Sequence, residues 1–145
     1  MLGDGWANSM AQETKRATLT WQQDLRFLGS SPGVPAVTID GDNVVGPGPM
    51  LTLLLATASC TGSDMVLILQ KMREKLGELR IDVAGVRREE EPRRYISIHL
   101  DYWVRGEGLD PAKVRRAIDL SLEKYCSVIH SLAPDIAITY ALSLA

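Results

Sequence analysis

The chain contains two cysteines, Cys60 and Cys126, and these are the residues that could most directly carry out chemistry. The sequence around them predicts that both lie at helix ends: Cys60 just before a helix that starts near Ser63, and Cys126 just after one that ends near Lys124. At the amino end of a helix, backbone N–H groups and the helix dipole stabilise a thiolate, the nucleophilic form of cysteine. Arg26, in an otherwise apolar segment, could add a nearby positive charge.

A thiolate beside a guanidinium in apolar surroundings can attack the O–O bond of a hydroperoxide and become a sulfenic acid. A second thiol then converts the sulfenic acid to a disulfide, which an external dithiol reduces. Two other interpretations stay open. The first is that the cysteines only fill space in the core, as free cysteines often do. The second is a metal site made of both cysteines with His99 and His130, although it lacks a close ligand pair such as Cys-x-x-Cys. Residue types alone leave the function open.

Composition and length narrow the class of protein. The 145 residues fit one domain, which we place at residues 17–145 after a flexible tail at residues 1–16. A net charge of −2 argues against a nucleic-acid partner. The apolar stretch 50–58 is about half the ~20 residues of a membrane span, and residues 1–10 do not resemble a secretory signal. We therefore expect a cytoplasmic protein with no membrane partner and no structural disulfide.

The first half of the chain predicts a small antiparallel sheet followed by helices. Alternating residues indicate strands at 17–21 and 36–40, joined by a segment that we interpret as a hinge carrying Arg26. Residues 50–58 are apolar on nearly every side, which is typical of a helix buried all round. After Cys60 the apolar residues recur at three- and four-residue steps, which indicates a second, half-exposed helix.

The second half predicts two half-buried strands, a helix and a final strand. Period-two patterns mark strands at 80–88 and 95–104, and Asp110-Pro111 supplies the start of a helix that runs to about Lys124. The final strand covers residues 136–144. Segregated strands and helices define an α+β protein. One chain of this size has little with which to cover a helix that is apolar on all sides, so we expect an obligate homodimer.

Several motifs together resemble those of a known family. They are Pro-x-Pro-Met leading into an apolar helix that ends in Cys-Thr-Gly-x-Asp (47–64), Leu-Gln-Lys-Met-Arg (69–73), His-Leu-Asp-Tyr-Trp-Val-Arg-Gly (99–106), and Ala-Ile-Asp-Leu-Ser-Leu-Glu-Lys-Tyr-Cys-Ser-Val (117–128). In this order, and with both cysteines placed, the chain resembles the OsmC/Ohr family of osmotically inducible and organic hydroperoxide resistance proteins, in its OsmC-like branch.

The resemblance implies an intertwined α+β homodimer in which antiparallel sheets wrap around buried central helices, with active sites at the subunit interface. It implies a cysteine-based peroxidase of the oxidative stress response: Cys60 would be the peroxidatic cysteine, Cys126 the resolving cysteine, and Arg26 the arginine that steadies the thiolate. Organic hydroperoxides would be the substrates, and a lipoyl group or another dithiol the reductant. No metal and no organic cofactor are expected.

One feature departs from the family pattern. Many relatives carry a glutamate nine or ten positions before the first cysteine, where this chain has Leu51 and Met50. Arg26 would then either pair with another acid, such as Asp24, or remain free. Without that glutamate, a pocket near Met50 and Leu51 would be more apolar than in such relatives, which suits a hydrophobic substrate. The alternative hypothesis is a non-catalytic OsmC-like dimer that binds an apolar small molecule or acts as a redox sensor.

Overall fold

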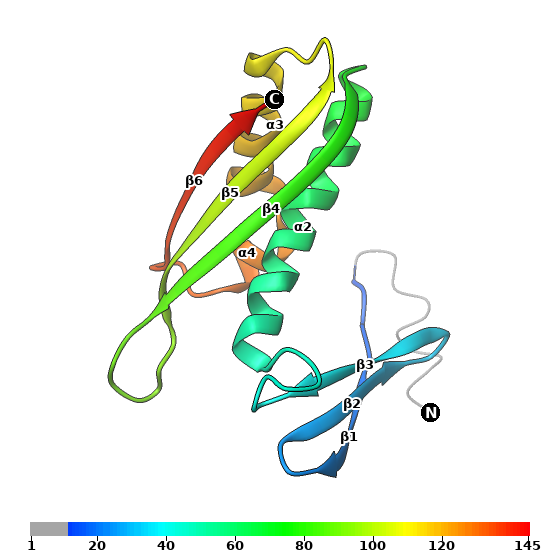
Figure 1. Ribbon diagram of the computed structural model, residues 1–145, viewed down its shortest axis with the longest axis vertical. Helices are drawn as coiled ribbons and strands as arrows, with labels where there is room; N and C mark the ends of the chain where they lie inside the picture. The colour runs from blue at the N-terminus through cyan, green and yellow to red at the C-terminus, as the bar shows by residue number, and fades with distance from the viewer. Residues whose placement is uncertain (1–11) are drawn as a thin grey trace. The chain divides into compact units, whose positions relative to one another are not determined.

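The computed structural model describes residues 12–145, shown in Figure 1. Most of the tail predicted at residues 1–16 lies outside the described residues. The chain divides into two compact units, one ending at Thr52 and the other spanning Leu53–Ala145. The α+β class expected from the sequence is confirmed, because strands and helices are segregated along the chain: each unit contains one sheet, and the helices do not alternate with single strands.

The first unit contains a three-stranded antiparallel sheet. Its strands are β1 (Thr18–Gln23), β2 (Arg26–Ser31) and β3 (Val34–Asp40), in the order β1-β2-β3. The predicted antiparallel sheet is confirmed, but the segment interpreted as a hinge is its central strand. The chain reverses in a tight turn at Asp24, whose φ of 47° is in the left-handed region, so a strand can begin again at Arg26.

Helix α2 (Pro49–Lys71) is continuous, so the prediction of two helices meeting near Cys60 is wrong. Its serine and threonine hydroxyls donate to main-chain carbonyls four residues earlier: Thr57 to Leu53 at 2.8 Å and Ser63 to Ser59 at 2.8 Å. These bonds satisfy the polar side chains without breaking the helix. Cys60 therefore lies within its helix and not at the N-terminus of a helix, and the expected stabilisation of its thiolate by its own helix end is removed.

The second unit is built on a mixed three-stranded sheet. Strands β4 (Lys75–Arg87) and β5 (Tyr95–Glu107) are antiparallel, as predicted, and β6 (Ala137–Leu144) pairs with β5 in parallel. The sheet is thus not purely antiparallel. A parallel return needs a long crossover, and the helices between β5 and β6 supply it. Ile98, Leu100 and Tyr102 of β5 are fully buried.

The crossover consists of α3 (Pro111–Leu120), a π-helical turn η1 (Ser121–Tyr125) and the short helix α4 (Ser127–Ser131). The predicted N-cap is present, since the Asp110 side chain accepts a hydrogen bond of 2.9 Å from Ala112 N. Figure 1 shows α2 and α3 on the same face of the sheet. Gly62 allows α2 to lie close to β4, because an added Cβ would lie 3.2 Å from Ile81 Cδ1.

In the single chain α2 is not buried all round, and the prediction that a second copy covers it stays a prediction. Leu54, Met65 and Leu69 are buried, whereas Leu51 and Leu55 are 47% and 55% exposed. By length and composition α2 could span a membrane, but a core helix meets the same criterion. Only 28% of the apolar window of α2 is buried in the single chain, and exposed apolar side chains such as Leu51 and Leu55 mark a face that a second copy or another apolar partner could cover.

Candidate functional site

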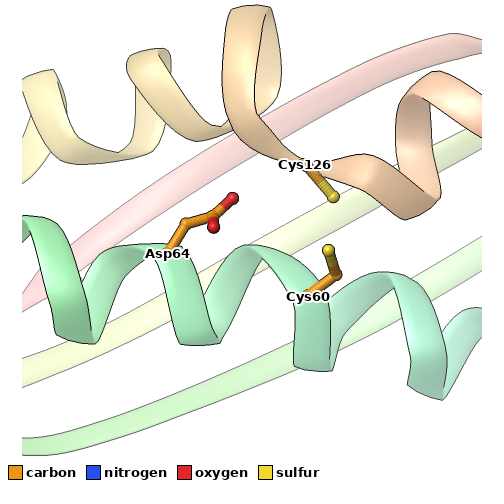
Figure 2. Close-up of side chains that lie close together, drawn as sticks. All are labelled: Cys60, Asp64 and Cys126. Atoms are coloured by element: carbon orange, nitrogen blue, oxygen red, sulfur yellow. The ribbon is translucent and has the colours of Figure 1, made fainter. Parts of the chain in front are cut away.

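The second unit brings the two cysteines together with one carboxylate. Cys60 lies in the middle of α2, and Cys126 lies between η1 and α4. Figure 2 shows both thiols and Asp64 pointing into the same space. The two Sγ atoms and a carboxylate oxygen of Asp64 all lie within 4.8 Å of one another. Both cysteines are reduced, and Cys60 is half-buried while Cys126 is completely buried.

Local backbone structure explains this meeting. Cys60 and Asp64 are four residues apart on one helix, so they share a face. The π-helical turn ends at Cys126, whose N–H donates to Ser121 O at 2.7 Å. The Cys126 carbonyl in turn accepts from His130 N–H at 3.1 Å and lies 2.8 Å from His130 Nδ1. The Cys126 backbone is thus fixed on both sides, and its thiol is held against α2.

The two thiols differ in their electrostatic environment. Burial raises the pKa of Cys126 to about 11, and the nearby Cys60 thiol and Asp64 charge add to this rise, while a bond from the Ile129 main chain opposes it. Cys126 is therefore a protonated thiol at neutral pH. A reagent from solvent meets Cys60 first because only Cys60 is partly exposed.

A chain of buried hydroxyls leads from the sheet to this site. Tyr102 OH lies 2.8 Å from Thr61 Oγ1, Thr61 Oγ1 lies 2.8 Å from Ser121 Oγ, and Ser121 Oγ donates to Asp64 Oδ2 at 2.9 Å. All three hydroxyl-bearing residues are fully buried. Burial raises the pKa of Tyr102 to about 12, so its hydroxyl keeps its proton. The chain connects β5, α2 and η1 by hydrogen bonds that none of them could form alone.

Sequence reasoning gave Asp64 and the hydroxyl chain no role in the site. Thr61 and Asp64 stand in the Cys-Thr-Gly-x-Asp motif, and the four-residue step from Cys60 to Asp64 could have identified the carboxylate. Tyr102 and Ser121 also stand in quoted motifs, at 99–106 and 117–128, but their contacts join segments that are far apart in the sequence and follow from no local spacing.

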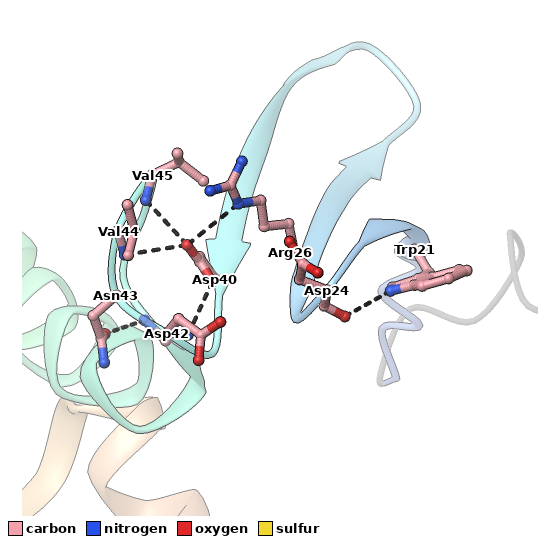
Figure 3. A network of polar contacts seen from close by, with 9 residues as sticks. Trp21, Asp24, Arg26, Asp40, Asp42, Asn43, Val44 and Val45 are labelled. Carbon is pink, nitrogen blue, oxygen red and sulfur yellow. Dashed lines mark hydrogen bonds and ion pairs between the residues drawn. The ribbon is translucent and has the colours of Figure 1, made fainter.

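Arg26 lies in the first unit and pairs with an acid that the sequence did not suggest. Its Nε is 3.8 Å from Asp40 Oδ2 (Figure 3). Asp24, named as an example of a partner, instead uses its main-chain carbonyl to accept from Trp21 Nε1 at 2.8 Å. Asp40 replaces it because its carboxylate is buried at the end of β3, next to the start of β2.

Three main-chain N–H groups hold Asp40 more closely than Arg26 does. They belong to Asp42, Val44 and Val45, at 2.9, 3.1 and 3.0 Å. These bonds, that of Val45 first, keep the pKa of Asp40 below its ordinary value, and the charge of Arg26 contributes last. The carboxylate therefore remains satisfied when Arg26 moves.

The remaining candidates are placed as follows. Met50 and Leu51 lie in the first turn of α2, half-buried and exposed respectively, and their role as pocket residues stays a prediction. A hollow of about 580 Å³ in the second unit is lined by Trp103, among others. Since side chains alternate along a strand, Trp103 faces away from Tyr102 and the thiols. This hollow is not part of the thiol site.

The histidines of the metal hypothesis are engaged elsewhere. The His99 ring lies 2.6 Å from Thr139 Oγ1, and His130 Nε2 lies 3.1 Å from Glu123 O. The cysteines and Asp64 provide three donors without them, one fewer than a structural zinc site holds.

The fold and the site define an α+β protein in which two reduced thiols and a carboxylate lie close together in the second unit. A family model described as OsmC-like protein matches residues 40–141. Protein YhfA of Escherichia coli K12 is 39% identical over 127 residues, which are 87% of this chain and 95% of YhfA. The chain belongs to the OsmC-like family.

Solved structures agree with this assignment. A hypothetical protein from Aquifex aeolicus is 29% identical, with a TM-score of 0.81 over 92% of this chain and 99% of that one. An OsmC-like protein from Mycoplasma pneumoniae shares the fold at 18% identity, with a TM-score of 0.80 over 92% and 98%. The organic hydroperoxide resistance protein OhrB of Bacillus subtilis shares it at 16% identity, with a TM-score of 0.61 over 90% and 98%.

Proposed function

We propose that the chain is a thiol-dependent peroxidase that reduces organic hydroperoxides. The observation that carries this proposal is the pair of reduced sulfurs within 4.8 Å of each other, one half-exposed and one fully buried. The half-exposed Cys60 is suited to meet the peroxide, and the buried Cys126 is suited to resolve the product. Membership of a family whose solved relatives include organic hydroperoxide resistance proteins supports the same chemistry.

The proposed reaction has three steps. The Cys60 thiolate attacks the terminal oxygen of the hydroperoxide and the O–O bond breaks. The alkoxide takes up one proton, equivalent to the one that the Cys60 thiol lost, and leaves as an alcohol while Cys60 becomes a sulfenic acid. Cys126 then attacks the Cys60 sulfur, which forms a disulfide and releases water. An external dithiol, such as a lipoyl group, reduces the disulfide and restores both thiols.

The wider setting of the reaction belongs to the same proposal. Arg26 would supply the positive charge that favours the Cys60 thiolate, and an apolar pocket near Met50 and Leu51 would receive the organic part of the substrate. A homodimer would cover the exposed leucines of α2, such as Leu55. We place the protein in the cytoplasm, where dithiol reductants are available.

The test is hydroperoxide consumption by the reduced protein with cumene hydroperoxide and dihydrolipoamide, followed by intact-mass measurement. We expect steady turnover, with loss of two hydrogens when the dithiol is omitted. Cys60→Ser should abolish turnover. The matched variant Cys126→Ser should oxidise once at Cys60 and then stop, because only the resolving step is lost. Equal turnover by Cys60→Ser and wild type would remove Cys60 from the mechanism.

The second candidate is a non-catalytic dimer that binds an apolar small molecule. It is favoured by the pairing of Arg26 with Asp40 and by the apolar Met50 and Leu51, which stand where the family resemblance implies a glutamate in many relatives. Under this hypothesis the wild type would consume no hydroperoxide and form no disulfide, yet would bind an apolar fluorescent probe that Leu51→Glu no longer binds.

A further inference from the structure

We propose that Asp64 relays the proton of the resolving step, from the Cys126 thiol to the hydroxyl group that leaves Cys60. This inference rests on the proposed peroxidase chemistry and adds a third participant to the thiol pair. It starts from a simple need: Cys126 is buried and protonated, so its proton must go to another group before or while its sulfur attacks.

Asp64 occupies the position that such a relay requires. One of its carboxylate oxygens lies within 4.8 Å of both sulfurs, a gap that one water molecule or a small side-chain movement can bridge. Figure 2 shows the carboxylate beside the space between the thiols rather than behind either of them. The titratable groups around it are Cys60 on α2, Cys126 after η1 and, through Thr61 and Ser121, Tyr102 on β5.

The hydroxyl chain fixes the orientation of Asp64. Each hydroxyl has a single proton, and a carboxylate only accepts. Ser121 Oγ donates to Asp64 Oδ2 and also lies within hydrogen-bond distance of Thr61 Oγ1, which in turn is bonded to Tyr102 OH. The Asp64 carboxylate is thereby tied through Ser121 to the buried hydroxyls of Thr61 and Tyr102. One oxygen of Asp64 is held by Ser121, and the carboxylate is left able to accept a further proton on the thiol side.

The proposed step conserves atoms and electrons. A lone pair of Cys126 sulfur forms the S–S bond, and the S–O bond of the Cys60 sulfenic acid breaks, with its electron pair going to oxygen. The Cys126 proton becomes strongly acidic as its sulfur loses electron density, so Asp64 can accept it. Asp64 then passes the proton to the departing oxygen, which leaves as water, and the carboxylate is regenerated.

The test compares the two half-reactions in wild type and Asp64→Asn. Oxidation of Cys60 is followed by trapping of the sulfenic acid with dimedone, and resolution by the appearance of the disulfide. We expect Cys60 oxidation to change less than threefold and disulfide formation to slow by about 100-fold, the lower range for loss of a general acid–base group. Asp64→Glu, which keeps the carboxylate, should recover part of the rate.

The pH profile separates a relay from a structural role. Without Asp64 only the small thiolate fraction of Cys126 can attack, so the resolving rate of Asp64→Asn should rise about tenfold per pH unit until the pH reaches the Cys126 pKa, which burial still raises in this variant. The wild-type rate should depend on pH much less. Asp119→Asn is the matched control, because Asp119 accepts a 2.9 Å bond from Tyr140 OH on the same unit, and it should behave like wild type.

A second readout does not depend on peroxide. An aromatic disulfide such as dithiobis(nitrobenzoate) first reacts with Cys60, which releases one thionitrobenzoate and leaves a mixed disulfide on Cys60. Cys126 then displaces the second thionitrobenzoate from this mixed disulfide in a step that also releases the Cys126 proton. Slow release of the second thionitrobenzoate by Asp64→Asn would support the relay. If the wild type consumes no hydroperoxide, that result would refute only the proposed function and would leave this readout valid. Wild-type rates of second release and of disulfide formation in Asp64→Asn would overturn the inference.

Discussion

The buried Cys126 thiol predicts that the reduced protein loses stability at alkaline pH. Its pKa is about 11 in the folded chain against an ordinary value of 9.0, a rise of about two units. At about 1.4 kcal/mol per unit, this corresponds to roughly 3 kcal/mol of unfolding free energy. Because the folded pKa is raised, this stability is fully present below pH ~9 and is lost as the pH rises towards ~11.

The measurement is urea unfolding of wild type and Cys126→Ala at fixed protein concentration, with reductant present, at steps from about pH 7 to pH 11. Tyr102 is also buried with a raised pKa, so both proteins lose stability near the top of this range. The difference in unfolding free energy between wild type and Cys126→Ala therefore reports the contribution of Cys126 alone. Cys126→Ala should start less stable, and the gap should narrow by roughly 3 kcal/mol across the range.

Cys60→Ser is the matched control, because it removes the half-exposed thiol and keeps the buried one. It should retain most of the alkaline loss seen in wild type, because burial is the largest cause of the raised Cys126 pKa and the Cys60 thiol contributes less. If wild type and Cys126→Ala instead lose stability in parallel between about pH 9 and 11, Cys126 titrates at its ordinary value, and the claim that burial keeps it protonated is refuted.

Three further predictions concern the scaffold. Gly85→Ala should lower the unfolding free energy measured in urea by about 1–3 kcal/mol, because the new Cβ would lie 2.5 Å from the ring of the buried Tyr95. Asp40→Asn should lower the Tm at neutral pH, and the difference from wild type should shrink below pH ~4, since a lowered carboxyl pKa stabilises only above its ordinary value. Leu55→Lys should shift the protein to monomer in light-scattering chromatography if a second copy covers α2, whereas an unchanged mass would refute that cover.

The parts of the fold that the sequence predicted are those set by local periodicity and capping. Strands β4 and β5 follow from apolar residues at every second position, which requires one buried face whatever lies against it. The start of α3 follows from Asp110 and Pro111, whose effect on a helix terminus depends only on neighbouring backbone.

The errors arose where tertiary contacts override local preference. Residues 57–63 contain threonines, serines and a glycine, which favour helix ends in isolation. In the folded chain Thr61 bonds to Tyr102, and Gly62 lets α2 approach β4, so the helix continues. The strand β2 was missed in the same way, because Gly29 and Ser30 break a pattern that pairing on both sides restores.

The short distance between the two thiols is also set by tertiary contacts and not by local preference. No local rule places Cys126 beside Cys60, since their contact depends on the crossover between β5 and β6 and on the widened π-helical turn at Ser121. The residue types can be read from the sequence, but the distance between the two thiols is set by the fold. Asp64 was predictable in principle, because its place on the Cys60 face follows from helix periodicity alone.

The pairing of Arg26 with Asp40 has a consequence for the proposed chemistry. A buried carboxylate that depends on one cation holds that cation firmly, because losing it leaves an uncompensated charge. Asp40 does not depend on Arg26 in this way, since three main-chain N–H groups bond it at up to 3.1 Å and the guanidinium lies at 3.8 Å. The Arg26 side chain is also about a third exposed. The Arg26 side chain can therefore leave Asp40 without leaving a buried charge unsatisfied, so the Arg26–Asp40 pair does not by itself argue against the role proposed for Arg26.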